Sequence, residues 1–419
     1  MLETTSREKE GSWTYQGWRV ALAGMLALIA GPSVFLLSFG IFVQPMGREF
    51  GWTVTQITLA ITLMSFALVL LAPLQGYLVD RFGARRVILP SILCFAAAVV
   101  MMSRLGADLW LYYLAWLVLC IAGIGCYPLS YLRAVGTWFD RRLGFSLGIA
   151  NAGVGIGGAL LPLVLALVIP ALGWRWGFLC IAMMALITFP IAFFFIRENA
   201  QAGPAKVASG ALEGVAFADA IRTRDFQLLT LTFILMGFVT TGLIVHQIPI
   251  LTEAGISPQR AALMQATFGV FAIVGRVVTG LLLDYICAQL LMMVVVLGAS
   301  LSCVLYAVGV GPQLAFVAAA LVGLLLGAEF DILGFLLKKH FGIRSFGRLY
   351  GIVYAVFQLS AGIGAAVLSL MKDSFAGYST GLMLFAAVLV VCAGTLFWHY
   401  LLEQAARSPS RQVAPPTHP

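Results

Sequence analysis

The sequence has 419 residues, of which 61% are hydrophobic and 10% are charged, and its formal net charge is +8. A chain this apolar cannot hide its surface from water inside a soluble domain, so the composition predicts an integral membrane protein. The seven cysteines lack C-x-x-C spacing, and no nucleophile–base pair, metal-ligand cluster or cofactor loop is visible, so we expect no enzyme activity, no metal and no cofactor.

Twelve apolar stretches are long enough to cross a bilayer, because a helical span needs about 20 apolar residues. Barrel strands would instead be about ten residues of alternating polarity. The pattern therefore predicts an all-α membrane protein with twelve transmembrane helices. The stretches lie near residues 19–45, 54–76, 86–105, 110–136, 144–168, 174–196, 227–250, 260–283, 287–309, 313–337, 347–371 and 378–402.

The positive charges indicate the topology. Most of the 25 lysines and arginines fall in the two tails and in alternate turns. Positive loops stay on the cytoplasmic side, so we expect both termini in the cytoplasm and a multi-pass protein of the inner (plasma) membrane. The net charge then reflects topology within the lipid bilayer, and no nucleic-acid partner is expected. No cleavable signal peptide is visible.

The chain contains an internal repeat. Residues 76–87 read GYLVDRFGARRV, and a degenerate copy, GLLLDYI, occurs 204 residues later at 280–286. Repeated halves with a substrate site between them are typical of secondary transporters. The expected organisation is an N-terminal six-helix bundle at 1–196, a cytoplasmic linker at 197–225, a pseudo-symmetric C-terminal six-helix bundle at 226–403 and a disordered C-terminal tail at 404–419.

The twelve predicted spans in two halves, together with G-x-L-x-D-R-x-G-x-R-R at 76–86, resemble the major facilitator superfamily over the whole chain. The resemblance implies that fold, with a tight inner turn after span 2 whose glycines let helices approach closely. An aspartate in this turn can pair with cationic groups and hold the two halves in one access state. The residues expected in this gate are Asp80, Arg81, Arg85, Arg86, Arg133, Asp140 and Asp284, and the arginines of the turn also mark the cytoplasmic side.

Two further segments resemble the monocarboxylate transporter family, in its bacterial form. They are QGWRV at 16–20 and WFDRRLGFSLGIANAGVGIGG at 138–158. The resemblance implies a carrier of organic anions. The small residues of the second segment permit close packing against a helix of the other half.

Arg276 is the leading candidate for binding substrate. It lies eight residues before Asp284, about 12 Å from the expected inner helix end and near mid-membrane. An arginine at that depth is costly and normally faces a cavity or a partner, and its planar fork matches a carboxylate. A structural ion pair within the second half is the alternative. Monocarboxylate carriers similarly use an arginine of span 8 for the substrate carboxylate.

Glu329 and Asp331 are the only carboxylates predicted well inside a span. The aspartate that animal monocarboxylate carriers place one turn before the arginine is Ala272 here, and span 1 lacks their lysine. Two residues apart, the acids point about 200° apart round a helix, so we expect Asp331 in a helix contact and Glu329 facing the cavity. An unpaired carboxyl in a dry place suits a proton carrier. Otherwise both acids are structural partners of Arg276 or of backbone donors.

Span 4 offers Tyr127, Ser130 and Tyr131 near mid-depth, beside Pro128, which loosens the helix. These hydroxyls are candidate substrate donors. Interhelical hydrogen bonding is an equal alternative for each.

Spans 7 and 11 contribute three further candidates. Tyr354 and Gln358 of span 11 are expected near the substrate, and the absence of a lysine there favours one carboxylate per substrate. His246 lies near the outer face of span 7, where it is either an interfacial anchor or part of proton coupling.

These features predict a monomeric secondary transporter of a small monocarboxylate such as lactate or pyruvate, coupled to protons as a symporter and working by alternating access. One alternative is a proton-driven exporter or exchanger of another organic anion or amphipathic compound. It is weakened by the absence from span 5 of the Gly-Pro pair typical of drug and proton antiporters. The other is a non-transporting carboxylate sensor, against which the short linker argues.

Overall fold

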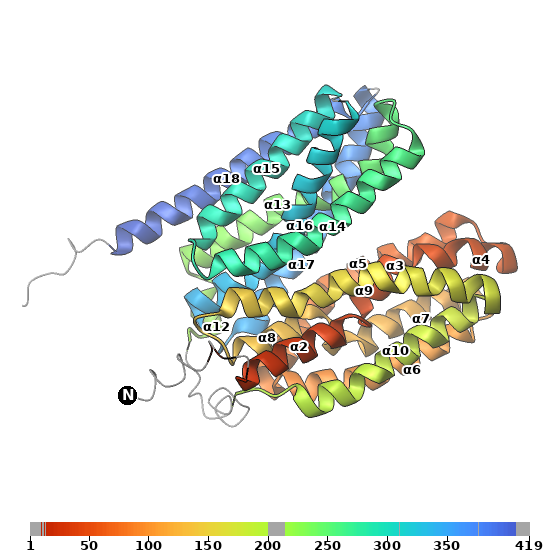
Figure 1. Ribbon diagram of the computed structural model, residues 1–419, viewed down its shortest axis with the longest axis horizontal. Coiled ribbons are helices and arrows are strands. Elements are labelled where there is room, and N and C mark those ends of the chain that lie inside the picture. Colours follow the sequence, from red (N-terminus) through yellow and green to blue (C-terminus); the bar gives the residue numbers. More distant parts are fainter. Residues whose placement is uncertain are drawn as a thin grey trace, which may run out of the picture.

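The computed structural model describes residues 10, 12, 14–199, 214–309, 311–375 and 377–407, and its regular elements there are helices and one isolated bridge, Gly214 to Gly342. Two helical bundles lie side by side (Figure 1). The first contains α2 (Gln16–Leu28), α3 (Pro32–Ser38), α4 (Gly40–Phe50), α5 (Val54–Phe82), α6 (Ala84–Ser103), α7 (Leu109–Ala122), η1 (Ile124–Cys126), α8 (Pro128–Gly136), α9 (Leu143–Leu172) and α10 (Trp174–Phe195). The short α12 (Phe217–Ala220) leads to the second, with α13 (Arg224–Glu253), α14 (Pro258–Leu283), α15 (Ala288–Val308), α16 (Pro312–Phe341), α17 (Phe346–Phe375) and α18 (Ser379–Arg407).

Eleven helices of the described part are long and apolar enough to cross a membrane. The difference from the predicted twelve lies in the fourth span, where α7, η1 and α8 replace one continuous helix. Gly123 ends α7, and Pro128 occupies the first position of α8, where its missing N–H costs no helical hydrogen bond. Pro128 therefore interrupts the helix as predicted, and twelve crossings remain a prediction that requires α7 and α8 to act as one span.

The bundle boundaries differ slightly from those expected. α18 runs to Arg407 and so continues four residues into the predicted disordered tail. The predicted linker contains α12, which is held near α16 by the bridge from Gly214 to Gly342. Residues 200–213 of the linker and 408–419 of the tail lie outside the described residues.

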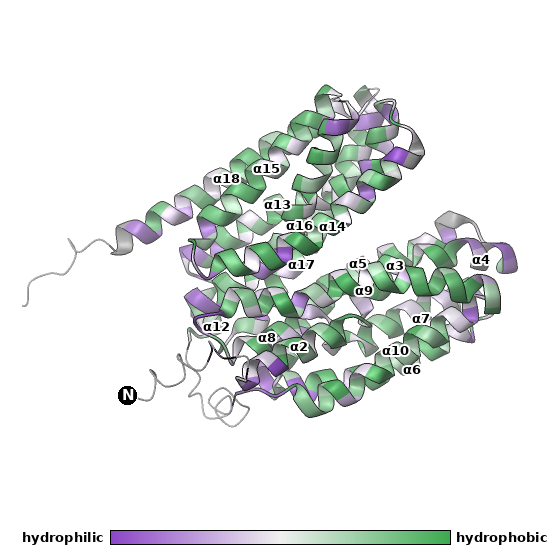
Figure 2. Cartoon of the chain, viewed as in Figure 1, coloured by the Kyte–Doolittle hydropathy of each residue, from purple (hydrophilic) through white to green (hydrophobic). Residues whose placement is uncertain are grey.

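The outer surface of both bundles is apolar over most of its length, and polar residues gather at the helix ends (Figure 2). Trp110, Leu70 and Leu167 are 83%, 77% and 76% exposed. Exposing so much apolar surface to water is unfavourable, whereas a bilayer is a suitable solvent for it. The surface therefore agrees with the composition in indicating a membrane-embedded protein.

The two bundles meet at one end and diverge toward the other (Figure 1). Across the interface α5 packs on α17, and α9 packs on α14. These contacts lie where α5 and α14 end and where α9 and α17 begin. We call this end of the molecule, where α2 begins and α18 ends, the closed end.

Glycines allow the bundles to touch at the closed end. A Cβ atom on Gly280 would lie 2.9 Å from the carbonyl oxygen of Gly144, and one on Gly347 would lie 3.1 Å from the Cα of Gly76. Larger residues at these positions would push the helix backbones apart. Gly76 and Gly280 are the first residues of the two copies of the internal repeat, so equivalent positions of the two halves make equivalent contacts.

Candidate functional site

A cavity of about 280 Å³ lies between the two halves, and both halves line it. The apolar part of its lining comes chiefly from leucine, isoleucine and phenylalanine side chains. Its polar lining consists of Ser33, Gln75, Tyr127, Asn151, Thr240, Thr241, Arg276, Glu329, Tyr350, Tyr354 and Gln358.

Several of the polar side chains lie toward the closed end. Arg276 lies seven residues before the end of α14, and Gln75 seven before the end of α5, which places both about 10 Å from that end. Asn151 follows the start of α9 by eight residues, or about 12 Å. By the same count Leu68 and Leu326 lie about 20 Å from the closed end. Thr240, Thr241, Glu329 and Gln358 lie about 18–26 Å from that end, so the floor holds the charged Arg276 and the walls mix polar and apolar side chains.

Arg276 reaches this floor from α14. Its side chain is 12% exposed, and within the described residues its one ion pair is with Asp331, at 3.9 Å from Nη1 to Oδ1. That separation is long for a charge-assisted hydrogen bond, which is typically about 2.7–2.9 Å. The guanidinium therefore keeps donors that can be offered to a ligand in the cavity.

Asp331 connects the two halves at this depth. Its side chain is fully buried, and its Oδ1 accepts a hydrogen bond from Nδ2 of Asn151 on α9. Oδ2 of Asp331 has no hydrogen-bond partner among the described residues. Asp331 does not line the cavity, so it lies in a helix contact as its position predicted.

Glu329 faces the cavity, also as predicted from the two-residue spacing. It is only 1% exposed, and its Oε2 has no hydrogen-bond partner among the described residues. Its other neighbours include the hydroxyl of Thr240. An oxygen that is buried without a partner is unfavourable as an anion and can be satisfied by a proton.

The structure separates the predicted substrate donors into two groups. Tyr127, Tyr354 and Gln358 line the cavity, and the Tyr127 hydroxyl is unpartnered among the described residues. Ser130 and Tyr131 do not line it and are almost completely buried. The Ser130 hydroxyl accepts a hydrogen bond of 2.8 Å from Gln75, so it orients a cavity side chain from behind. Interhelical bonding, the alternative for the span 4 hydroxyls, thus describes Ser130.

His246 lies away from the cavity, inside the second bundle. Its Nδ1 is 3.0 Å from the carbonyl oxygen of Gly242, and its Nε2 is 2.8 Å from the Ser369 hydroxyl on α17. Its ring also approaches Tyr378, with 5.7 Å between ring centroids. The structure therefore does not bring His246 together with Arg276, Glu329 and Asp331, and it places the residue in an interhelical contact.

Asp80 holds the closed end together. Its carboxylate accepts hydrogen bonds of 2.9 Å from the backbone amides of Gly347 and Arg348, in the first turn of α17. A carboxylate at a helix N-terminus satisfies free amides and interacts favourably with the helix dipole. Nε of the fully buried Arg133 lies 3.2 Å from Asp80, and Arg133 also pairs with Glu198. Asp80 and Arg133 thus occupy the predicted gate.

Asp284 repeats this arrangement in the opposite sense. Its carboxylate, at the end of α14, accepts hydrogen bonds from the amides of Gly144 (2.8 Å) and Phe145 (3.2 Å), in the first turn of α9. Burial raises the pKa of Asp284 to about 6, against the opposing effect of the bonds from Phe145 and Gly144. Each half therefore contributes one aspartate that caps a helix of the other half.

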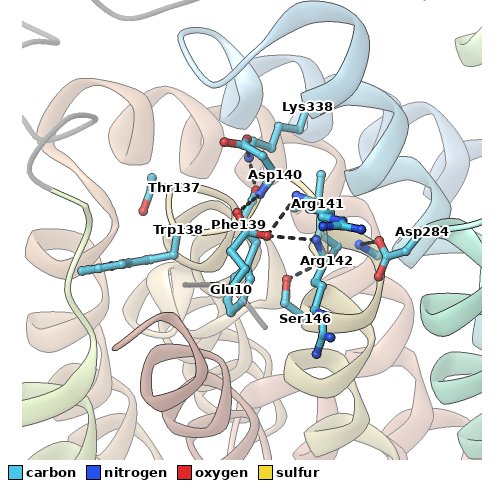
Figure 3. A network of polar contacts seen from close by, with 12 residues as sticks. Glu10, Thr137, Trp138, Phe139, Asp140, Arg141, Arg142, Ser146, Asp284 and Lys338 are labelled. Carbon is cyan, nitrogen blue, oxygen red and sulfur yellow. Dashed lines mark hydrogen bonds and ion pairs between the residues drawn. The ribbon is translucent and has the colours of Figure 1, made fainter. Parts of the chain in front are cut away.

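The turn between α8 and α9 adds a further contact across the interface (Figure 3). Asp140 pairs with Nζ of Lys338, on α16, at 2.7 Å. From the other side Glu10 accepts hydrogen bonds from the amides of Asp140, Arg141 and Arg142, at 2.9–3.1 Å. Glu10 thereby fixes the conformation of the turn that presents Asp140 to the second half.

The three basic residues of the repeat motif do not join the gate, and the prediction for them is corrected. Arg81 donates to Tyr77, and Arg85 donates to the carbonyl oxygen of Phe193 at 2.7 Å, both within the first half. Arg86 is exposed, and its side chain has no hydrogen-bond or ion-pair partner among the described residues. Their charges need no contact across the interface if, as predicted, this end of the molecule is cytoplasmic.

Six polar residues of the cavity were missed from the sequence: Ser33, Gln75, Asn151, Thr240, Thr241 and Tyr350. Asn151 lies in a glycine-rich segment that was interpreted as a packing surface. A polar amide inside an apolar helix is costly in a membrane, so its presence there was a usable signal. Gln75 carried the same signal, one residue before the repeat motif.

Comparisons with known proteins agree with this architecture. The family model described as Major Facilitator Superfamily matches residues 23–365 and 247–418. An "MFS-type transporter pytF" of Aspergillus terreus is 26% identical over 277 residues, 64% of this chain and 90% of that protein. The "Fujikurins efflux protein" of Gibberella fujikuroi is 27% identical over 197 residues, 46% of this chain and 42% of that protein.

"Monocarboxylate transporter 12" of Rattus norvegicus is 25% identical over 312 residues, 67% of this chain and 62% of that protein. Among solved structures, the fucose:proton symporter of E. coli superposes with a TM-score of 0.73 at 14% identity, covering 91% of this chain and 98% of that one. At that identity the likeness concerns the fold alone.

Proposed function

The chain belongs to the Major Facilitator Superfamily, so it is a multi-pass membrane transporter, and on that basis we propose that it is a proton-coupled secondary transporter of an organic monocarboxylate. The observation that carries the proposal is Arg276, a buried cation that lines a cavity between the halves and is only loosely paired. A rat relative with "monocarboxylate transporter" in its name supports the substrate class. The proposal includes both termini in the cytoplasm and a monomer in the inner membrane.

The substrate carboxylate would dock on the guanidinium of Arg276. A planar guanidinium offers two parallel N–H donors to the two carboxylate oxygens, which a lysine ammonium cannot do. The amides of Gln75 and Asn151 and the hydroxyl of Tyr127 surround the same floor and can donate to further polar groups. Because the two bundles diverge away from the closed end (Figure 1), the substrate would enter from that side.

The proton would be carried by Glu329 and Asp331. A carboxylate substrate competes with Asp331 for Arg276. Once Arg276 binds the substrate, the Asp331 carboxylate lacks a cationic partner, and an unpaired anion in the membrane interior is strongly disfavoured. Protonation of Asp331 removes that cost, and the unpartnered oxygens of Glu329 and Asp331 are free to take protons. The loaded and protonated site is then less charged, and the halves can reorient around it.

The gate would open by separation of the halves at the closed end. Asp80, Asp284 and the Asp140–Lys338 pair hold the present state, in which the cavity faces away from the termini. Separation releases these contacts and the glycine pairs, and it would expose Arg276 to the other side. Since the proposal places both termini in the cytoplasm, the cavity of the present state would face the outside of the cell.

Uptake and counterflow of labelled carboxylates in proteoliposomes test the proposal. Arg276→Lys should lower uptake at least about tenfold, because it removes the fork while keeping the charge. Arg260→Lys is the matched control, since Arg260 is an exposed residue of the same helix. Uptake of all tested acids at the wild-type rate by Arg276→Lys would contradict the anchoring role. Binding without counterflow would favour a sensor.

A further inference from the structure

The cavity is large for a short acid. A volume of about 280 Å³ has room for an acid longer than three carbon atoms. Small-molecule sites usually bury most of the surface of their ligand, so an empty remainder would leave apolar walls without contacts. The size of the cavity therefore admits a longer substrate.

Much of the wall above Arg276 is apolar and comes from four helices of both halves, although Thr240, Thr241, Glu329 and Gln358 line it at similar heights. Leu37 lies on α3, Leu68 on α5, Ile244 on α13 and Leu326 on α16, and all four line the cavity. Leu326 lies about 12 Å farther from the closed end than Arg276, measured along the helix axes. A ligand anchored at the floor would reach these side chains only through an extended apolar part.

Aromatic side chains occupy the middle of the same wall. Phe330 and Phe357 line the cavity and lie edge to face, with 5.0 Å between ring centroids. Both are about 16 Å from the closed end, between Arg276 and Leu326. Such a pair offers apolar contact to an alkyl chain and an edge or face to an aryl ring.

From the single arginine and the many leucine and phenylalanine side chains of this cavity we infer that the substrate is an amphipathic monocarboxylate, an alkyl or aryl acid of roughly six to ten carbon atoms rather than a three-carbon acid. Its carboxylate lies on Arg276 and its tail points away from the closed end, between Leu68 and Leu326. This inference rests on the proposed function, because it assumes that Arg276 binds a carboxylate, and it adds the chemical class of the rest of the molecule.

The test is equilibrium binding of the straight-chain acids from butanoate to decanoate to the purified protein, measured by calorimetry at constant pH. Burial of one methylene contributes about 0.8 kcal/mol, so affinity should rise about fourfold per methylene up to the length at which the cavity is filled. Octanamide, which has the same tail without the charge, should bind at least tenfold more weakly than octanoate. The octanamide comparison separates anchoring from partition into detergent.

Two leucine variants test where the alkyl tail of the bound acid lies. Leu326→Ser should weaken octanoate at least tenfold and butanoate less than twofold, because only the longer acid reaches this side chain. Leu301→Ser is the control, since Leu301 is 52% exposed on the outer surface of α15. It should change neither affinity.

The two proposals fail in different ways. The wild-type protein could bind butanoate and octanoate with equal affinity, and Arg276→Gln could bind neither. That result would overturn the inference of an amphipathic substrate and leave the proposal of monocarboxylate binding intact. Acids that bind Arg276→Gln as tightly as the wild type, or that do not bind either protein, would overturn the proposed function and the inference with it.

Discussion

The carboxylate of Asp284 binds the backbone amide of Gly144 in the other half of the molecule, at 2.8 Å. Asp80 binds the amide of Gly347 in the same way at 2.9 Å, with the halves exchanged. Each aspartate comes from one copy of the repeat, and each capped helix begins at the corresponding place in the other half. The interface is therefore closed twice by one device, a carboxyl group that accepts hydrogen bonds from the free amides of a helix N-terminus.

We predict that low pH favours the conformation in which the two halves touch at the closed end over one in which they separate there. Burial raises the pKa of Asp284 to about 6, whereas the pKa of a carboxyl released into water returns toward the ordinary aspartate value of 3.8. The closed state thus binds the proton more tightly, so its population rises as the pH falls from about 6 toward 4 and declines as the pH rises through 6. The effect is reduced by solvent screening, since this carboxyl is only partly buried.

Spin-label distances between cysteines placed at the exposed positions Arg86 and Arg344, one in each half, measure this equilibrium. Asp284→Asn is the control, because it keeps an acceptor oxygen and removes the titration. At low pH, the population of molecules with the spin-label distance of the closed state should increase in the wild-type background. The increase should be much smaller in Asp284→Asn. A closed population that grows with rising pH, or an identical profile in both proteins, would refute the prediction.

We predict that Gly280→Ala opens the closed end. The new Cβ would lie 2.9 Å from the Gly144 carbonyl oxygen, which is backbone and cannot turn aside. Gly269→Ala, on the same helix, is the control, because a Cβ there meets nothing within 4 Å and alanine favours the helix by up to about 1 kcal/mol. The same spin-label distance should lengthen for Gly280→Ala alone. If both variants kept the wild-type distance distribution, the close contact would not decide the conformation.

We predict that Glu329→Gln uncouples transport from protons. The amide preserves the shape of the side chain but cannot exchange a proton at Oε2. Counterflow exchange should persist, while accumulation driven by a pH gradient falls at least about tenfold. Asp331→Asn tests the second acid in the same assay. Accumulation at the wild-type level by both variants would remove these carboxyls from the coupling mechanism.

We predict that Asn151→Leu destabilises the present state. The variant removes the hydrogen bond to Asp331 and leaves a buried carboxylate less satisfied, at a cost of about 1–3 kcal/mol. The melting temperature should fall, and the loss should be smaller when Asp331→Asn is already present. Strictly additive losses in this double-mutant cycle would show that the two side chains do not interact.

The helical period was sufficient to predict which residues of one helix face which way. Glu329 and Asp331 lie on opposite sides of α16, as their spacing required, and Pro128 interrupts the fourth span. These features are local, because a side-chain direction follows from the 3.6-residue turn and a break follows from a missing N–H. The predicted role of Arg276 depends on one helix as well, through its depth.

The errors and omissions concern contacts between helices. Arg81 and Arg85 were assigned to the gate, yet they bond within their own half, while Glu10 and Lys338 take part and were not predicted. A positive charge after a span is explained by topology alone, so its sequence position carries no information about a partner. Such contacts depend on chain segments more than 100 residues apart.

By itself the sequence determined the environment and the plan of the protein: its apolar composition requires a membrane, and its repeat requires two similar halves. Only the tertiary structure decided that the halves touch at one end through glycine pairs and aspartate-capped helices, and that Asn151 and Arg276 both line the cavity and contact Asp331 behind it. The reason is physical. Solvation and helix formation act on each segment separately, whereas a site between two bundles exists only for one relative placement of them, which many weak contacts choose together.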